Sequence, residues 1–105
     1  MPEDQNILFD VETQIGFRVR TTKEYWKRSI TKHPEIAQKQ FELMEVLNNP
    51  TEIRISNQDE NVYLFYGKEG KYWLTAVVKK INSIDFFLTS YLTDKIKEGK
   101  TIWHK

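Results

Sequence analysis

The hydrophobic period of the chain changes at Pro50, and this change constrains the fold more than any other feature of the sequence. Between about residue 22 and Pro50, apolar residues recur at helical spacing, which is typical of helices that bury one side. After Pro50, apolar and polar residues alternate, which is typical of strands with one buried face. Helices followed by strands indicate an α+β domain in which the two kinds of element pack together.

Two helices are predicted in the first half of the chain. The first runs from about residue 22 to residue 32 and ends at His33, because the residue before a proline avoids helical torsion angles. Pro34 suits the first position of a second helix, which runs to about residue 48. The apolar side of this second helix holds Ala37, Phe41, Met44 and Leu47. His33 is therefore expected at the elbow between the two helices.

Four alternating stretches follow, joined by short turns, as expected for an antiparallel meander. They cover residues 51–56, 62–66, 72–80 and 84–91. Residues 17–20 are predicted to form a further short strand, residues 93–99 one helical turn, and residues 101–103 a last edge strand. The acidic segment over residues 1–15 is expected to form a loose N-terminal arm or an edge strand.

The sequence thus predicts one α+β domain over residues 16–105, with two N-terminal helices packed on one face of a four- to five-stranded antiparallel sheet. The helices are expected to cover Ile53, Ile55, Leu74, Ala76, Val78, Ile84, Phe86 and Leu88. The opposite face carries Arg54, Thr75, Lys79, Thr89 and Tyr91, and only the termini remain to cover it. An open face with cations, hydroxyls and a phenol is typical of a binding site for a polyanion.

Composition excludes several classes of site. The chain has no cysteine, which rules out thiolate metal sites and cysteine nucleophiles, and its two histidines are too few for a histidine-rich metal site. We therefore predict neither a metal nor a cofactor. The net charge of +1 argues neither for nor against nucleic acid as a partner. No apolar run approaches the ~18 residues of a membrane span, and the acidic N-terminus is unlike a signal peptide, so a cytoplasmic protein without membrane contact is expected.

Several short motifs run through most of the chain in a fixed order. They are Phe17-Arg18-Val19-Arg20, Trp26-x3-Ile30-x2-His33-Pro34-Glu35, Leu47-x2-Pro50-x2-Ile53, Leu64-Phe65-Tyr66, Val77-Val78-Lys79, Thr89-Ser90-Tyr91 and Ile96-Lys97-x-Gly99-x2-Ile102-Trp103. In order and spacing they resemble the phage-type branch of the barnase, EndoU, colicin and RelE-like (BECR) nucleases. The resemblance implies metal-independent cleavage of RNA, often by a toxin that an antitoxin holds inactive. It also implies functional positions at His33, Lys79, Thr89 and Tyr91.

Cleavage of RNA without a metal ion uses the neighbouring 2′-hydroxyl as the nucleophile and leaves a cyclic phosphate and a free 5′-hydroxyl. His33 is expected to transfer a proton, since the unperturbed pKa of histidine lies near ~6.5. Lys79 or Arg54 would hold the phosphoryl oxygens, and Thr89 would donate a hydrogen bond to them. Tyr91 would stack on a base or act as a weak acid, and its unperturbed pKa near ~10 favours the positioning role. The further residues expected to contact the substrate are Arg54, Thr75, Trp73 and Arg20.

Other interpretations of the same residues stay open. His33 can serve only to end a helix, and Lys79, Thr89 and Tyr91 can be ordinary strand residues. The same face would also suit a non-catalytic module that binds single-stranded nucleic acid or a protein. A hydrolase or transferase with another substrate is a third interpretation, although no nucleophile or metal motif supports it. The partners expected for the nuclease are an RNA substrate and an antitoxin or immunity protein.

Overall fold

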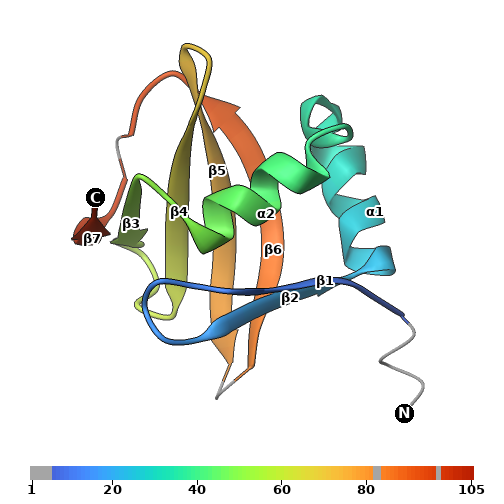
Figure 1. Cartoon of the computed structure of the whole chain (residues 1–105), viewed down its shortest axis with the longest axis horizontal. Coiled ribbons are helices and arrows are strands. Elements are labelled where there is room, and N and C mark those ends of the chain that lie inside the picture. The colour runs from blue at the N-terminus through green and yellow to red at the C-terminus, as the bar shows by residue number, and fades with distance from the viewer. Residues whose placement is uncertain (1–5, 82–83, 97) are drawn as a thin grey trace.

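The computed structural model describes residues 6–81, 84–96 and 98–105 (Figure 1). In chain order its elements are β1 (Ile7–Glu12), β2 (Arg18–Thr22), α1 (Lys23–Lys32), a 3-10 turn (Pro34–Ile36), α2 (Gln40–Asn48), β3 (Glu52–Ile55), β4 (Val62–Glu69), β5 (Tyr72–Ile81), β6 (Ile84–Thr93) and β7 (Lys100–His104). The helix α1 begins after Thr22, whose side chain accepts a hydrogen bond from the backbone N–H of Tyr25. Within the described ranges no helix is long and apolar enough to cross a membrane.

The seven strands found in these residues form one sheet in the order β1-β2-β6-β5-β4-β3-β7. Strands β6, β5, β4, β3 and β7 make an antiparallel block of five, and β1 and β2 make an antiparallel hairpin. The hairpin joins the block through a short parallel pairing of β2 with β6, in which Val19 pairs with Asp85 and Arg20 with Phe86. The sheet is therefore mixed.

The predicted architecture of two N-terminal helices on one face of a four- to five-stranded antiparallel sheet was wrong. Two strands precede α1, and one of them pairs in parallel with β6. The helix α2 lies across a face of the sheet. The helix α1 lies instead beside the edge of β6, along the part of that strand that does not pair with β2 (Figure 1). Periodicity reports only which side of an element is buried, so it does not reveal a pairing between strands that lie far apart in the sequence.

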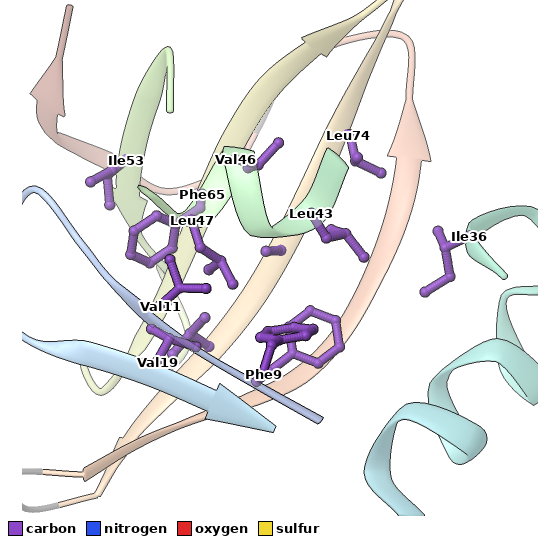
Figure 2. Packing of buried hydrophobic residues seen from close by; sticks show 13 residues of the cluster. Phe9, Val11, Val19, Ile36, Leu43, Val46, Leu47, Ile53, Phe65 and Leu74 are labelled. Atoms are coloured by element: carbon purple, nitrogen blue, oxygen red, sulfur yellow. The ribbon is translucent and has the colours of Figure 1, made fainter. Parts of the chain in front are cut away.

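The core lies between α2 and the sheet face that this helix covers, and Figure 2 shows its side chains. From α2, the side chains of Leu43, Val46 and Leu47 are buried against the sheet. The strands contribute to this core the side chains of Phe9, Val11, Val19, Ile53, Phe65, Leu74, Ala76, Val78 and Phe87. The inward orientation predicted for Ile53, Leu74, Ala76 and Val78 is confirmed. Ile55 is half-buried.

The second helix predicted over residues 34–48 is interrupted. Residues Pro34–Ile36 form a 3-10 turn, and α2 starts only at Gln40. Phe41, which was predicted to face the sheet, is 79% exposed. The interruption after Ile36 changes the helical phase, so a continuous period extended across it assigns the wrong residues to the buried side.

Strand β6 contains a β-bulge that changes which of its side chains face the core. Val78 pairs with Phe87, but the adjacent Val77 pairs with Thr89, so Leu88 is the extra residue of the bulge. Phe87 is consequently fully buried, whereas Leu88 is half-buried. The prediction that Leu88 belongs to the buried core beneath the helices was therefore wrong, because Phe87 takes that position.

Two further predictions concern the segments that flank this bulge. The side chains of Ile84 and Phe86, which were also assigned to the core, lie outside the described part of the structure. The helical turn predicted over residues 93–99 is not found among the described residues of that segment, which form bends at 94–95 and 98–99.

The acidic arm contains β1 from Ile7, and residues 1–5 lie outside the described ranges.

Candidate functional site

A row of polar side chains crosses the sheet on the face opposite α2. From β6 to β7, the residues aligned in register are Tyr91, Thr75, Tyr66, Glu52 and His104, and we call them the cross-strand row. Along their strands they alternate with core residues, so their side chains leave the sheet on the other face. Neighbouring strands are about 4.8 Å apart, which makes the row roughly 19 Å long.

Arg54 and Thr101 both bind the carboxylate of Glu52. Arg54 Nε donates a hydrogen bond to Glu52 Oε2 at 2.7 Å, and Thr101 Oγ1 donates to the same oxygen at 2.5 Å. Arg54 Nη1 also reaches the backbone oxygens of Glu98 and Gly99, at 3.5 and 3.4 Å. Burial disfavours the charged form of Glu52, but the hydrogen bonds from Thr101 and Arg54 outweigh it and hold the pKa of Glu52 below its ordinary value. Glu52 is therefore a fixed negative charge at neutral pH.

The segment between β6 and β7 also reaches this face, so the expectation that only the termini could cover it was wrong. Ser56 Oγ donates a hydrogen bond to Glu98 Oε1 at 3.3 Å, which connects the segment to the end of β3. Gly99 has a φ of 94°, and a Cβ at this position would lie 2.6 Å from the backbone oxygen of Ile55. Glycine is therefore required here for the close approach of the two backbones.

Two phenols occupy the middle of the cross-strand row and its β6 end. Tyr66 is 1% exposed, and Tyr91 is half-buried. Burial raises the pKa of Tyr66, and the nearby Tyr91 hydroxyl and Glu98 carboxylate raise it further. Burial likewise raises the pKa of Tyr91, whose hydroxyl is within hydrogen-bonding reach of Tyr66. Both phenols therefore stay protonated at neutral pH, and the half-buried Tyr91 can donate a hydrogen bond to an anion.

His33 lies next to Tyr91, at the β6 end of the cross-strand row. Its backbone N–H donates to the carbonyl of Ser29 at 2.8 Å and so ends α1. The imidazole is 33% exposed, and its ring centroid is 6.3 Å from that of Tyr91. Its Nδ1 lies 3.6 Å from a carboxylate oxygen of Glu35. An imidazole, a phenol and a carboxylate thus meet at a point that solvent can reach.

The structure brings several of the predicted site residues close to one another. The rings of His33 and Tyr91 are in contact. Arg54 lies in the next row of paired residues, which runs across the sheet through Leu64 and Val77 to Thr89. Thr89 occupies the same neighbouring row, about 7 Å along β6 from Tyr91. Its Oγ1 is buried and has no hydrogen-bond partner among the described residues. Trp73 flanks the cross-strand row on its other side.

Two predicted site residues, Lys79 and Arg20, lie apart from the others. Lys79 follows Thr75 by four residues along β5, which is a separation of roughly 13 Å. Its Nζ lies 3.7 Å from a carboxylate oxygen of Asp59. Arg20 belongs to β2, on the other side of β6, and its Nε lies 3.9 Å from Asp10. Sharing a strand face does not place two residues in one site when several positions separate them.

The residues of this face that were not assigned to the site from the sequence include Tyr66, Glu52 and Glu98. Tyr66 and Glu52 do carry a signal, because each is a polar residue at an outward position of an alternating strand. Their proximity depends on the register between β3 and β4, which alternation alone does not fix. Glu98 carries no such signal, since it belongs to an irregular segment.

In the part of the chain that the structure describes, no three or more His, Asp or Glu side chains are grouped closely enough to hold a metal ion. Comparison with known proteins adds no assignment: the chain matches no protein-family model, no curated protein and no solved structure. The resemblance to the BECR nucleases therefore stays a prediction.

Replacing Glu52 with glutamine is expected to lower the free energy of unfolding at pH 7 by about 1–3 kcal/mol, because Arg54 and Thr101 lose a charged acceptor. The pKa of Glu52 is lower in the folded protein than the 4.5 of a free side chain, so the unfolded chain binds the proton more readily. The stabilisation is thus complete above about pH 4.5 and is lost as the pH falls through the folded-state pKa. Urea denaturation at pH 7 and pH 3.5 measures both effects.

The matched control for this prediction is Glu60→Gln, which removes an exposed carboxylate from the turn before β4. Its free energy of unfolding should stay within about 0.5 kcal/mol of the wild-type value at both pH values. The Glu52→Gln variant should differ from wild type less at pH 3.5 than at pH 7. Equal stability of the Glu52→Gln variant and wild type at pH 7 would contradict the role given to this carboxylate.

Proposed function

We propose that this protein is a metal-independent endoribonuclease in which the 2′-hydroxyl of RNA attacks the neighbouring phosphate. The observation that supports the proposal best is the contact between the His33 ring and Tyr91 at the end of the cross-strand row. At that point Tyr91 supplies a hydrogen-bond donor for a phosphate and His33 supplies a proton-transfer group, and the Arg54 guanidinium lies farther across the face, on the side of Tyr66. The products expected are a 2′,3′-cyclic phosphate and a free 5′-hydroxyl.

Two proton transfers are needed, one from the attacking 2′-hydroxyl and one to the departing 5′-oxygen. His33 is suited to one of them, because Glu35 lies beside Nδ1 and leaves Nε2 free to face the substrate. Glu98 is proposed for the other, since its carboxylate is close enough to Tyr66 and Tyr91 to affect the pKa values of both. With Glu98 as the base and His33 as the acid, the proton taken from one oxygen is balanced by the proton given to the other.

The negative charge on the phosphate requires donors that are fixed in place before the reaction. Tyr91 stays protonated and is half-buried, so it can donate its O–H to a non-bridging oxygen. Tyr66 is 1% exposed and lies within hydrogen-bonding reach of Tyr91, so it helps to hold that hydroxyl in position. Arg54 Nε is used by Glu52, and Nη1 is used by the backbone oxygens of Glu98 and Gly99, which leaves the N–H groups of Nη2. Its remaining N–H groups can bind the phosphate, and Glu52 keeps the guanidinium in position. Lys79 has no role in this arrangement because it lies along β5, away from His33.

A second candidate function is a non-catalytic module that binds single-stranded nucleic acid or a protein on the same face. The contacts of Arg54 favour it, because Glu52, Glu98 and Gly99 all receive hydrogen bonds from this guanidinium. A cation held by so many internal contacts suits a rigid binding surface as well as a catalytic one. Cleavage of RNA is the property that separates the two candidates.

The proposal includes a toxin role and two kinds of partner, RNA as the substrate and an antitoxin or immunity protein as the inhibitor. An inhibitor is expected because a free ribonuclease would degrade the RNA of the cell that produces it. A cytoplasmic location is part of the same proposal, since that is where the RNA lies. Co-purification of an inhibitor that blocks access to His33 would support this part of the proposal.

Incubation with a single-stranded RNA is expected to give fragments that end in a 2′,3′-cyclic phosphate and begin with a 5′-hydroxyl. A 2′-deoxy nucleotide placed at the cut position should abolish cleavage there, because the nucleophile is then missing. Mass spectrometry of the fragments identifies both ends, and a chelator in the reaction should leave the rate unchanged. Cleavage that continues at the deoxy position, or that stops in the chelator, would contradict the proposed reaction.

A further inference from the structure

A groove of about 620 Å³ lies between α1 and the part of β6 that β2 leaves unpaired. It forms because β2 ends at Thr22 and the chain turns into α1, so a helix rather than a strand lies beside this part of β6. Ser29 Oγ donates a hydrogen bond to the backbone oxygen of Leu88 at 3.3 Å and holds the two elements together. The residues that line the groove include Tyr25, Lys27, Arg28, Lys32, Leu88 and Thr89.

The charge of this groove is positive. Lys27, Arg28 and Lys32 line it together with the acidic Glu24. Arg28 lies 3.7 Å from Glu24 in a pair that solvent largely surrounds, and such pairs contribute little. Among the described residues, no carboxylate lies within ion-pair distance of Lys27 or Lys32. Tyr25 is 38% exposed, with the Arg28 guanidinium 5.7 Å from its ring centroid.

The groove leads to the candidate site. Lys32 immediately precedes His33, and Thr89 lies on β6 about 7 Å before Tyr91. A chain molecule bound at His33 and Tyr91 can therefore continue into the groove along β6. Positive side chains beside an accessible aromatic ring are the combination by which proteins hold single-stranded nucleic acid, since bases stack on the ring while the cations follow the phosphates.

We propose that this groove binds single-stranded RNA on one side of the phosphate that is cleaved, with Lys27 and Lys32 at the RNA backbone and Tyr25 against a base. The identity of the strand rests on the proposed ribonuclease function. A single strand fits better than a duplex because only unpaired bases can be displaced far enough to stack on Tyr25.

The test compares the Lys27→Ala/Lys32→Ala variant with wild type in binding a short fluorescent RNA whose riboses are 2′-O-methylated and therefore cannot be cut. Alanine keeps the helix propensity of α1. Each phosphate contact contributes about 0.7 to the steepness with which log K falls with log salt concentration. The loss of two contacts should therefore reduce this slope by about 1.4, and Kd at 0.1 M salt should rise about 25-fold. The control variant Lys71→Ala/Lys100→Ala loses the same charge from exposed positions outside the groove and should bind within about twofold of wild type.

Three outcomes separate this proposal from the ribonuclease proposal. If the groove variant binds the probe like the control variant, the groove proposal fails, even where wild type cleaves RNA. If the probe binds in a groove-dependent way but wild type cuts no RNA, the groove proposal holds and the nuclease proposal fails. If polyglutamate binds in a groove-dependent way and the RNA probe does not, the occupant is an acidic protein and the RNA assignment fails.

Discussion

Replacing His33 with alanine is expected to reduce RNA cleavage by about 10²–10⁴-fold, because the reaction then lacks one of its two proton-transfer groups. The substitution should leave the fold intact, since His33 connects to α1 through its backbone N–H, which alanine retains. Its ring is 33% exposed and does not belong to the core. Single-turnover cleavage rates measure the loss, and the affinity for a 2′-O-methylated RNA should change by less than about threefold.

Gln38→Ala is the matched control, because Gln38 is an exposed residue of the same elbow between α1 and α2. Its cleavage rate should stay within about twofold of the wild-type rate. A His33→Ala variant that cleaves RNA as fast as this control would exclude His33 as an acid or base. A variant that loses affinity and rate in equal proportion would show instead that the imidazole only binds the RNA.

Local rules were sufficient for the features that depend on neighbouring residues. The torsional restriction before Pro34 placed His33 at the end of α1, where the structure has it. Alternation after Pro50 located β3, β4 and β5 and identified inward residues such as Ile53 and Ala76. These strands are joined by short turns, so their order in the sheet follows from their order in the chain.

The features that sequence reasoning missed depend on contacts between distant segments. The pairing of β2 with β6 involves Val19 and Arg20, whose alternation is too short to reveal a partner. Glu98 reaches the open face only because Gly99 permits a close backbone approach, and alternation does not describe an irregular segment. Lys79 and Thr75 lie on the same face of β5 but roughly 13 Å apart. Alternation identifies the face of each residue and not the distance between them.

The bulge in β6 connects the core to the candidate site. Tyr91 follows Phe87 by four positions, so an unbroken strand would place both side chains on the same face. The extra residue Leu88 allows Phe87 to enter the core while Thr89 and Tyr91 face the opposite side. The position of Tyr91 beside His33 is therefore linked to the burial of Phe87.

Phe87→Ala is accordingly expected to lower the free energy of unfolding by about 3–5 kcal/mol, because the Phe87 ring is fully buried. Its centroid lies 5.9 Å from that of the Phe9 ring and 6.0 Å from that of the Trp26 ring. Leu88→Ala should cost less than about 2 kcal/mol, since Leu88 is half-buried beside the groove. Unbroken alternation predicts the reverse order, with Leu88 in the core. Urea denaturation of both variants decides between the two arrangements. A greater loss for Leu88→Ala would rule out the bulge.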